Sequence, residues 1–512
     1  MITDLFPFPD FRAGQKEALH EAKEGIEDDE TEVVVLDLPT GLGKSAINTT
    51  LARSVDGAYI TTPQTSLRKQ MAEDDVLKDY YHVLKAKDDY VCDKCERSAT
   101  YCSMDDTCPG DVYERARAKA RNADISLMTV ALLAMVDNEE FVERDTLVVD
   151  EAHGIEGYTA NLLAGFTASP NHLPEEVYGD IAVGLKKDTK THHGEVYDLV
   201  GKLKGACQTF VGKHGESQDR LGDVQDCLNF ISSAERFFEE TNRGLTWTVN
   251  VFDTENSDGD MIRSFSVKPV DVAPYLRENF WSRGETIVLS TATYPGEKWL
   301  GRIGLDPNKT KVISADNPFP MDNRMIRISD TVCKMSRKRD MKNWTEIMET
   351  VDRIGDRHEG QKGVVHTVSY YRAERIENES DQWDNLKDNV IVANYDGAFD
   401  DWQNSDKDIL LSPSMTEGVD LKGEMCEWQI MLKIPFPSLA DSRVEYLINR
   451  KNRWDWYYQV AATDIVQAAG RAVRSEKDKA EFYILDECFN DVHSRANFPE
   501  WFTRAITPLT PV

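Results

Sequence analysis

The sequence predicts an α/β protein whose strands run parallel, divided into two or three domains. Short β-rich runs alternate with helical patterns over most of the chain, as they do in parallel-sheet domains. A length of 512 residues exceeds what one ordinary hydrophobic core holds. With 40% hydrophobic and 29% charged residues, the composition is that of a soluble globular protein.

The expected strands fall into two groups, separated by a stretch in which the strand signal fades. The first group is Glu32–Leu38, Thr146–Asp150 and Thr286–Thr291. The second group is Gly363–Val368, Asn389–Asn394, Asp408–Leu411, Glu427–Ile434 and Glu481–Leu485. Helical, polar sequence dominates between roughly Ile155 and Val270. Because strand Thr286–Thr291 resumes the earlier pattern, we expect this stretch to be an insertion in the first α/β domain.

Composition and charge restrict where the protein acts and what it binds. No apolar run is long enough to span a bilayer, and the N-terminus lacks a signal-peptide pattern, so we expect a cytoplasmic protein without a membrane partner. The formal charge of −30 argues against coating nucleic acid by bulk attraction. A local basic channel remains compatible with it. Residues 334–342 are rich in Lys and Arg, and residues 450–458 place aromatics after basic groups. Each stretch is either a contact for single-stranded nucleic acid or a solvated face beside core aromatics.

The segment Pro39–Ser45, with the sequence PTGLGKS, has the features of a phosphate-binding loop. It follows the first strand and opens an expected helix over Ser45–Ser54, as such loops require. The glycines let backbone N–H groups approach phosphate oxygens, the lysine reaches the β and γ phosphates, and the serine hydroxyl can ligate Mg²⁺. The loop departs from the G-x-x-x-x-G-K-[ST] pattern because Leu38 stands at the first glycine position. Its expected nucleotide-binding residues are Thr40, Gly41, Gly43, Lys44 and Ser45.

The tetrapeptide Asp150–His153 (DEAH) ends an apolar strand, which brings two carboxylates to the edge of the sheet. We expect Asp150 to hold Mg²⁺ and Glu151 to act as the base that deprotonates the attacking water. The alternative is a surface acid pair after a buried strand. A phosphate loop upstream in the same α/β pattern makes that alternative weak.

Near the end of the chain, Gln467–Arg474 has the sequence QAAGRAVR. Arg471 and Arg474 are three residues apart, so on a helix they would share one face and could point at a triphosphate across an interface. Guanidinium groups in that position stabilise the charge that develops on a transferring phosphoryl group. Surface salt bridges are the alternative for two isolated arginines. The accompanying Gln467 and Gly470 argue against it.

Four of the nine cysteines lie within 17 residues, and their spacing is C-x2-C-x6-C-x5-C. They are Cys92, Cys95, Cys102 and Cys108. Four thiolates can hold a [4Fe–4S] cluster or a tetrahedral zinc ion. Zinc ribbons usually offer two tight C-x2-C pairs and the second pair here is wide, which favours the iron–sulfur cluster and leaves zinc as the alternative. The other five cysteines are scattered and are expected to be ordinary buried thiols.

Basic residues surround the cysteine segment. They are Lys85, Lys87, Lys94 and Arg97, followed by Arg115, Arg117, Lys119 and Arg121 on an expected helix over Asp111–Asn122. On that helix Arg115 and Lys119 share one face and Arg117 and Arg121 share another, so one of these pairs could contact phosphates. Acidic residues are interleaved, and a solvated surface is the competing interpretation for each residue.

Taken in order, these segments resemble the motifs of the superfamily 2 helicases, specifically the iron–sulfur branch that contains XPD and DinG. The matching segments are Phe11–Gln15 (Q motif), Pro39–Ser45 (I), Thr61–Thr65 (Ia), Asp150–His153 (II), Ser290–Thr293 (III), Val364–Tyr370 (IV), Thr416–Asp420 (V) and Gln467–Arg474 (VI). The family also carries its metal cluster between motifs Ia and II. The short chain, the STAT form of motif III and the pair Asp486-Glu487 depart from XPD and favour a DinG-like or divergent member.

The resemblance implies two RecA-like motor domains with ATP between them, and a small Fe–S domain and a mainly helical arch inserted in the first. The implied ranges are 1–84, 123–158 and 271–315 for motor domain 1, 85–122 for the Fe–S domain, 159–270 for the arch and 316–512 for motor domain 2. The resemblance also implies adenine recognition by Gln15 and nucleotide contacts by Glu417 and Asp420 of motif V.

The function implied by the resemblance is ATP-dependent helicase activity on single-stranded DNA and on tailed or forked duplexes, typically in the 5′ to 3′ direction. The residues leave two rivals open: a translocase or remodeller that does not separate strands, and a binding accessory that uses ATP hydrolysis only as a switch. A complete set of acids and arginines argues against the accessory. RNA stays open as a substrate, because such motors contact mainly the backbone. Protein partners and oligomeric state are not predicted, although a monomer is compatible with the sequence.

Overall fold

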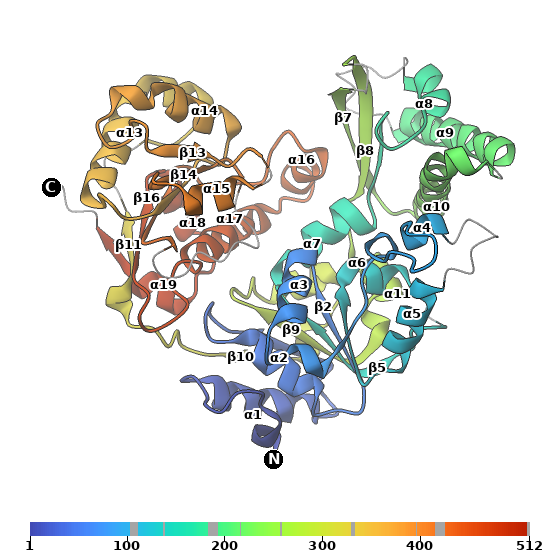
Figure 1. Ribbon diagram of the computed structural model, residues 1–512, viewed down its shortest axis with the longest axis horizontal. Coiled ribbons are helices and arrows are strands. Elements are labelled where there is room, and N and C mark those ends of the chain that lie inside the picture. Colours follow the sequence, from blue (N-terminus) through green and yellow to red (C-terminus); the bar gives the residue numbers. More distant parts are fainter. Residues whose placement is uncertain are drawn as a thin grey trace.

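The computed structural model describes residues 1–102, 111–136, 139–182, 193–215, 217–255, 259–328, 333–395, 397–414 and 425–508. Within these ranges the strands form two seven-stranded sheets and one three-stranded sheet. Figure 1 shows the first motor domain below, the second at the upper left and the inserted domain at the upper right. The predicted fold class, two parallel α/β domains with a mainly helical insertion in the first, is confirmed.

The first large sheet is parallel throughout and holds the phosphate loop. In spatial order its strands are β10 (Thr310–Ser314), β1 (Val33–Asp37), β9 (Gly284–Thr291), β5 (Arg144–Val149), β2 (Ala58–Thr62), β4 (Ile125–Thr129) and β3 (His82–Val83). Its helices are α1 (Gln15–Ile26), α2 (Lys44–Ala52), α3 (Thr65–Glu73), α5 (Val112–Asn122), α6 (Val130–Met135), α7 (Ile155–Tyr158), α11 (Ala273–Asn279) and α12 (Glu297–Ile303). The Val-Val-Val-Leu run of β1 is fully buried, as expected of a central strand covered on both faces.

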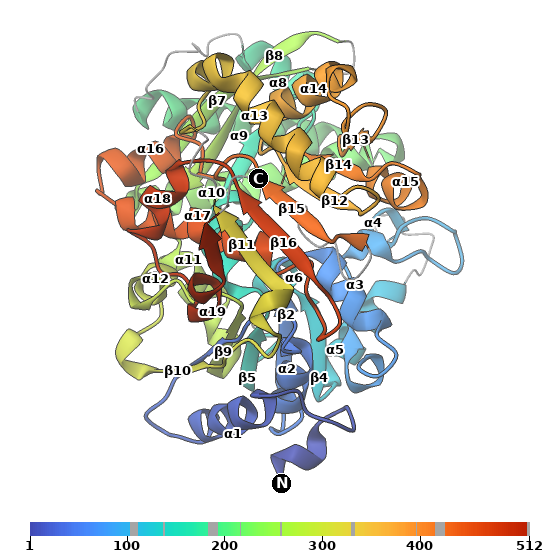
Figure 2. The ribbon, with the colours of Figure 1, turned by 90° about the vertical axis from the view of Figure 1, so that its left-hand side faces the viewer.

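The second large sheet is also parallel and is formed by the C-terminal part of the chain, as Figure 2 shows. Its strands are β13 (Val390–Val392), β14 (Ile409–Ser412), β12 (Gly363–His366), β15 (Trp428–Met431), β16 (Ala480–Ile484), β11 (Arg324–Ile328) and β17 (Ile506–Pro508). Its helices are α13 (Arg337–Arg357), α14 (Tyr370–Glu379), α15 (Ala398–Asn404), α16 (Ser442–Asn449), α17 (Trp454–Ala469), α18 (Cys488–His493) and α19 (Glu500–Arg504).

The insertion contains more β structure than we expected. Helices α8 (Glu175–Ala182), α9 (His193–His214) and α10 (Leu221–Asn242) accompany an antiparallel sheet of β6 (Phe166–Ala168), β8 (Met261–Pro269) and β7 (Trp247–Glu255). The hairpin β7–β8 escaped prediction because it is rich in polar residues: beyond the buried start of β7, most of its positions are at least partly exposed.

The eight predicted strands are all present, with ends that differ from the prediction by a few residues at most. Sheet order explains why their loops meet. Strands β1, β9 and β5 are neighbours, so the phosphate loop, motif III and the DEAH segment all leave the same carboxyl edge of the sheet. The domain boundaries given above stay a prediction.

A buried ionic node joins the first motor domain, the insertion and the second motor domain. Glu156 of α7 accepts from Arg302 Nε of α12 at 3.0 Å and from Arg443 Nη2 of α16 at 3.2 Å. Arg443 also donates to the carbonyls of Pro269 and Val270, where the insertion returns to the first domain. All three charged side chains are less than 13% exposed.

We expect Glu156→Ala to lower the free energy of unfolding by about 3–5 kcal/mol, because removing one partner of a buried ion pair leaves uncompensated charge. Chemical denaturation measures this. Arg243 pairs with Glu239 and Glu278 at exposed positions, so Glu278→Ala is the matched control and should change stability by less than about 1 kcal/mol. Equal losses of unfolding free energy for the two variants would contradict a stabilising role of the buried ion pairs.

A buried histidine makes the stability of the second motor domain dependent on pH. Burial, followed by the nearby charge of Arg471, lowers the pKa of His366 from 6.5 to about 4. The unfolded chain therefore binds the extra proton between pH 6.5 and 4, and stability falls as the pH falls through that window. On acidification from pH 7 to 4, the free energy of unfolding should fall by up to about 3 kcal/mol more for the wild-type protein than for His366→Gln. Denaturation midpoints at several pH values check this, and parallel curves for the two proteins would contradict it.

Candidate active site

A cavity of about 760 Å³ lies between the two motor domains, and ten of the predicted site residues line it. From the first domain these are Thr40, Gly41, Gly43, Lys44, Ser45, Asp150 and Glu151, and from the second they are Gln467, Arg471 and Arg474. The arrangement follows from sheet order in the first domain and from the end of α17 in the second. Acids, a lysine and arginines thus meet in one space large enough for a nucleotide.

The phosphate loop joins the end of β1 to the start of α2, as predicted. Gly41 and Gly43 have φ angles of +83° and +89°, which side chains rarely adopt. A Cβ atom at Gly43 would stand 2.5 Å from Gln15 Nε2, and one at Gly41 would stand 2.4 Å from the Phe319 ring. Backbone shape and close contacts therefore both require glycine at these positions, and the loop leaves its N–H groups at the N-terminus of α2.

The DEAH segment places its two carboxylates at the floor of the cavity. Lys44 Nζ lies 3.6 Å from Glu151 Oε1, and Asn48 donates to Asp150 Oδ1 at 3.3 Å. Burial, reinforced by the charge of Glu151, raises the pKa of Asp150 to about 6. Burial also acts to raise the pKa of Glu151, but Lys44, His153 and the two arginines outweigh it and hold that pKa below its usual value. The base position thus stays ionised at neutral pH.

Glu151 has a φ of +47°, a strained backbone conformation for a residue with a side chain. His153 links this strained turn to motif III: its Nδ1 lies 3.5 Å from Glu151 Oε2 and 3.3 Å from Thr291 Oγ1. Thr291 in turn bonds the backbone of Thr293. His153 and Thr291 thus connect the DEAH turn to the end of β9 by direct polar contacts.

The two arginines do not lie on one helical face, which corrects our expectation. Helix α17 ends at Ala469, with Gly470 as its cap, and Arg471 and Arg474 lie in the irregular segment before β16. Gly470 lies so close to the first domain that a Cβ atom there would stand 2.2 Å from Thr40 Oγ1, so this position requires glycine. The segment still carries both arginines into the cavity, through loop geometry instead of helical periodicity.

Gln15 is not part of the cavity wall in this structure. It is buried in the first turn of α1, where its amide bonds the Leu42 carbonyl and accepts from the backbone N–H of Arg12. Arg12 donates a hydrogen bond to the Gly41 carbonyl of the loop, and it does line the cavity. Gln15 thus holds the phosphate loop through its hydrogen bond to the Leu42 carbonyl, on the side away from the cavity. Glu417 and Asp420 of motif V lie outside the described residues.

Sequence reasoning missed Asn48, which is fully buried and orients Asp150. A signal was available, because Asn48 stands one helical turn after Lys44 and a helix that begins at the phosphate loop places positions 44 and 48 on one face. Asp464 of α17 also lines the cavity and stands three residues before Gln467, so the two lie on one side of that helix.

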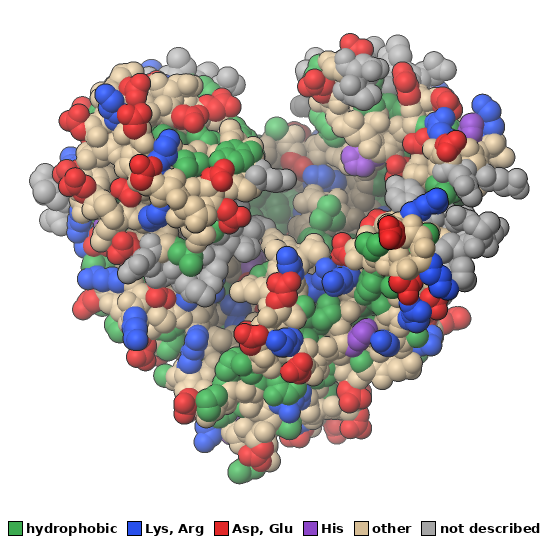
Figure 3. Space-filling view, viewed as in Figure 1, with side chains coloured by type: hydrophobic (Ala, Val, Ile, Leu, Met, Phe, Trp, Pro, Cys, Tyr) green, Lys and Arg blue, Asp and Glu red, His purple; other side chains and the backbone are tan. Residues whose placement is uncertain are grey.

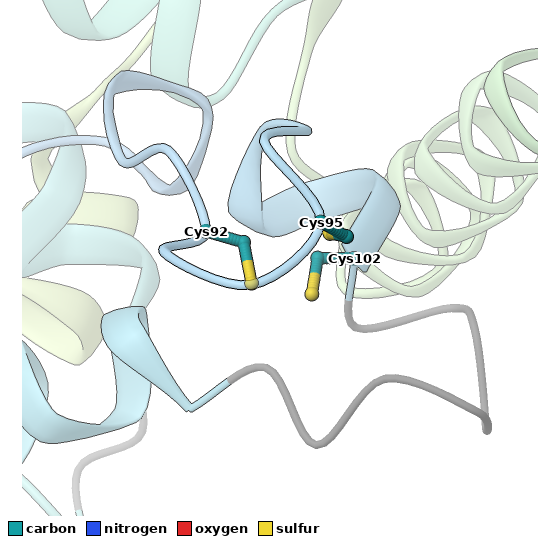
Figure 4. Close-up of side chains that lie close together, drawn as sticks. All are labelled: Cys92, Cys95 and Cys102. Carbon is teal, nitrogen blue, oxygen red and sulfur yellow. The ribbon is translucent and has the colours of Figure 1, made fainter.

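Three of the four predicted metal ligands lie together. The Sγ atoms of Cys92, Cys95 and Cys102 are within 4.8 Å of one another, on a turn and at the end of α4 (Ala99–Cys102). Figure 4 shows the three side chains around one space. The backbone N–H groups of Cys95 and Lys94 lower the pKa of the Cys92 thiol to about 6. Cys108 lies outside the described residues.

The donor set fits a bound metal. Soft thiolates in a tight group, one of them with a lowered pKa, are ligands for zinc or iron. The three Sγ atoms lie within 4.8 Å of one another, close enough to share one metal centre.

Most of the basic residues of α5 are paired with acids. Arg117 and Arg121 both pair with Glu140. Arg115 is half-exposed and pairs with Asp111 at 3.0 Å and with Asp93 at 3.5 Å. Lys119, on the same face as Arg115, is exposed, which makes it the better candidate for a phosphate contact.

In the stretch 450–458, Trp456 and Tyr457 are core residues, less than 9% exposed, which favours the core interpretation for both. Trp454 alone among its aromatics is strongly exposed, at 42%, beside the exposed Arg450 and Lys451. Of residues 334–342, the side chains of 337–341 lie outside the described ones. Lys334 pairs with Asp491 at 2.7 Å.

Comparison with known proteins gives two family matches. Residues 357–505 match the family described as "Helicase C-terminal domain", and residues 9–172 match "Type III restriction enzyme, res subunit". No curated protein matches the chain in sequence. None of the described helices is long and apolar enough to cross a membrane.

Several solved structures have the same fold. "XPD_Helicase" superposes with a TM-score of 0.61 at 15% identity, with 98% of this chain and 100% of that chain covered. "Structure of S. tokodaii Xpd4" gives 0.60 at 16% identity, with coverage of 98% and 100%. "XPD_APO" gives 0.59 at 15% identity, with coverage of 96% and 100%. At these identities the likeness establishes the fold, including the insertions into the first motor domain.

Proposed function

We propose that this chain is an XPD/DinG-like superfamily 2 helicase, which hydrolyses ATP to move along single-stranded DNA and to separate duplex strands. The two family matches and the fold shared with XPD structures support the proposal. The observation that carries the proposal is the interdomain cavity. It gathers a phosphate loop, two carboxylates and two arginines from opposite domains. A cleft that needs both domains to be complete couples hydrolysis to their relative motion.

Each side chain has a role in this scheme. Lys44 and the loop N–H groups bind the β and γ phosphates, and Ser45 with Asp150 would hold Mg²⁺, which supplies charge neutralisation when bound. Glu151, held ionised by its cationic neighbours, takes the proton of the attacking water. Arg471 and Arg474 stabilise the charge that develops on the transferred group, and Gln467 orients the water or the γ phosphate.

The nucleic-acid path is proposed to cross the hollow between the second motor domain and the inserted domain, which Figure 3 shows above the first motor domain. The exposed Lys119 and the half-exposed Arg115, near the cysteine turn, are the proposed phosphate contacts. The direction, 5′ to 3′, is proposed from the motif resemblance alone.

The cysteine turn is proposed to hold a metal centre that cross-links the small domain. The position between motifs Ia and II supports a [4Fe–4S] cluster, and zinc, which grouped thiolates also bind, is the second candidate. Metal analysis and the visible absorption of anaerobically purified protein separate the two. Iron together with inorganic sulfide would support the cluster. Stoichiometric zinc without visible absorption would instead support a zinc site.

The test of the function is ATP-driven strand separation on duplexes with a 5′ or a 3′ single-stranded tail, using protein purified without oxygen. We expect separation only from the 5′ tail. Separation only from the 3′ tail would overturn the proposed polarity. Hydrolysis stimulated by DNA without separation on either substrate would favour a translocase or remodeller. Hydrolysis stimulated by RNA but not by DNA would identify RNA as the substrate.

A further inference from the structure

A chain of buried polar groups crosses the core of the second motor domain. His366, at the end of β12, and Gln429, on β15, are each 1% exposed. His366 Nε2 lies 3.0 Å from Gln429 Oε1, and Gln429 Nε2 donates to the Ala468 carbonyl at 3.2 Å. Burying an imidazole and an amide between apolar layers costs free energy unless their polar atoms are bonded. The bonds through His366 Nε2 and the Gln429 amide offset part of that cost, whereas His366 Nδ1 is buried with no hydrogen-bond partner among the described residues.

The directions of these hydrogen bonds follow from the Ala468 carbonyl. A carbonyl only accepts, so the amide nitrogen of Gln429 must face it, and the amide oxygen must face His366. His366 must then carry its proton on Nε2 and donate. The imidazole is neutral at physiological pH, because burial lowers the pKa of His366 to about 4. His366 thereby selects the one amide orientation that serves Ala468.

The Ala468 carbonyl belongs to the last turn of α17, where helix carbonyls lack partners along the helix. It also accepts the backbone N–H of Arg471 at 3.2 Å. Immediately before it stands Gln467, and after it Gly470 packs on Thr40 of the phosphate loop. Gln429 therefore anchors the point from which the chain leaves the helix and enters the interdomain cavity.

We propose that Gln429, oriented by His366, is a positioning residue for ATP hydrolysis: it fixes the end of α17 so that Gln467, Arg471 and Arg474 meet the triphosphate. Neither residue of the pair lines the cavity, so the pair acts only through the arginine segment. The inference rests on the proposed function. It assigns a role in that function to Gln429, which lies outside the helicase motifs given above.

Gln429→Leu removes the amide and keeps most of the side-chain volume. Gln429→Met is the second choice if the leucine variant does not fold. We expect kcat for DNA-stimulated ATP hydrolysis to fall by about 10- to 100-fold, as for small displacements of catalytic groups, with KM for ATP unchanged. His366→Phe should behave like Gln429→Leu, whereas His366→Gln, which keeps a donor, should retain most of the activity.

His358 supplies the matched control. It is also a buried histidine of this domain, 8% exposed, with Nε2 2.9 Å from Tyr483 Oη and Nδ1 2.7 Å from Gln361 Oε1. It stacks on Trp428, which lies on the face of the sheet opposite to Gln429. His358→Phe should lower the melting temperature without lowering kcat.

A double-mutant cycle gives the decisive readout. In an Arg471→Ala background, Gln429→Leu should cause little further loss of kcat, because both changes remove the same contribution. Independent, multiplicative losses would overturn the inference, as would equal kcat losses for His358→Phe and His366→Phe. A wild-type protein without ATP hydrolysis would overturn the proposed function and the inference with it. Hydrolysis that Arg471→Ala abolishes and Gln429→Leu leaves intact would overturn the inference alone.

Discussion

Replacing Arg471 with alanine is expected to lower kcat for ATP hydrolysis by about 10³-fold or more, the range found when an arginine finger is lost. Arg471 is only 9% exposed, lines the interdomain cavity and lowers the pKa of Glu151 through its charge. In the proposed mechanism it faces the position where charge develops during phosphoryl transfer. Lysine should not restore the rate, because it lacks the planar fork of guanidinium donors. Steady-state hydrolysis with single-stranded DNA in excess measures the effect.

Binding of a fluorescent ATP analogue should survive Arg471→Ala, because the phosphate loop lies on the other domain. Arg495→Ala is the matched control: this arginine of the same domain stacks on Tyr458, and its loss should leave kcat unchanged. Loss of nucleotide binding together with hydrolysis would assign Arg471 to substrate binding. An unchanged kcat would remove it from the catalytic set.

The sequence sufficed for the fold class because apolar runs of β-branched residues mark buried parallel strands without ambiguity. Val33-Val-Val-Leu and Leu147-Val-Val are examples. The same runs end at the phosphate loop and at Asp150, so the acid and lysine side of the site could be predicted from strand order alone. Short local patterns suffice where the chemistry lies at the end of a strand.

What could not be predicted depends on contacts between segments far apart in the chain. Arg471 reaches the cavity from a loop because Gly470 packs on Thr40, some 430 positions away, and no local pattern reports such a contact. Gln15 looks like a nucleotide ligand in sequence, yet its amide is used by the Leu42 carbonyl. The hairpin β7–β8 does alternate apolar and polar residues, as in Trp247-Thr-Val249-Asn-Val251, but its polar, largely exposed far end and the helical sequence before it obscured that signal.

Cys102→Ser is expected to abolish strand separation while nucleotide binding persists. A serine oxygen is a poor substitute for a thiolate toward zinc or iron, so the metal should be lost or weakly held. The proposed metal would replace the hydrophobic core that so small a segment lacks. Of its three described cysteines, Cys92 and Cys102 are 1% exposed, and few other side chains of the turn are buried. Tailed-duplex assays, metal analysis and binding of a fluorescent ATP analogue together measure the outcome.

Nucleotide binding should persist because the phosphate loop is built on β1 and α2, and none of the cysteines lines the interdomain cavity. Cys333→Ser is the control, since this half-buried cysteine lies in the second motor domain and should tolerate serine in every assay. A Cys102→Ser protein that separates strands at the wild-type rate would show that the metal centre is dispensable for the motor. Loss of ATP binding as well would show that the turn supports the whole first domain, and the small domain would then be structural for the ATPase and not a separate element of strand separation.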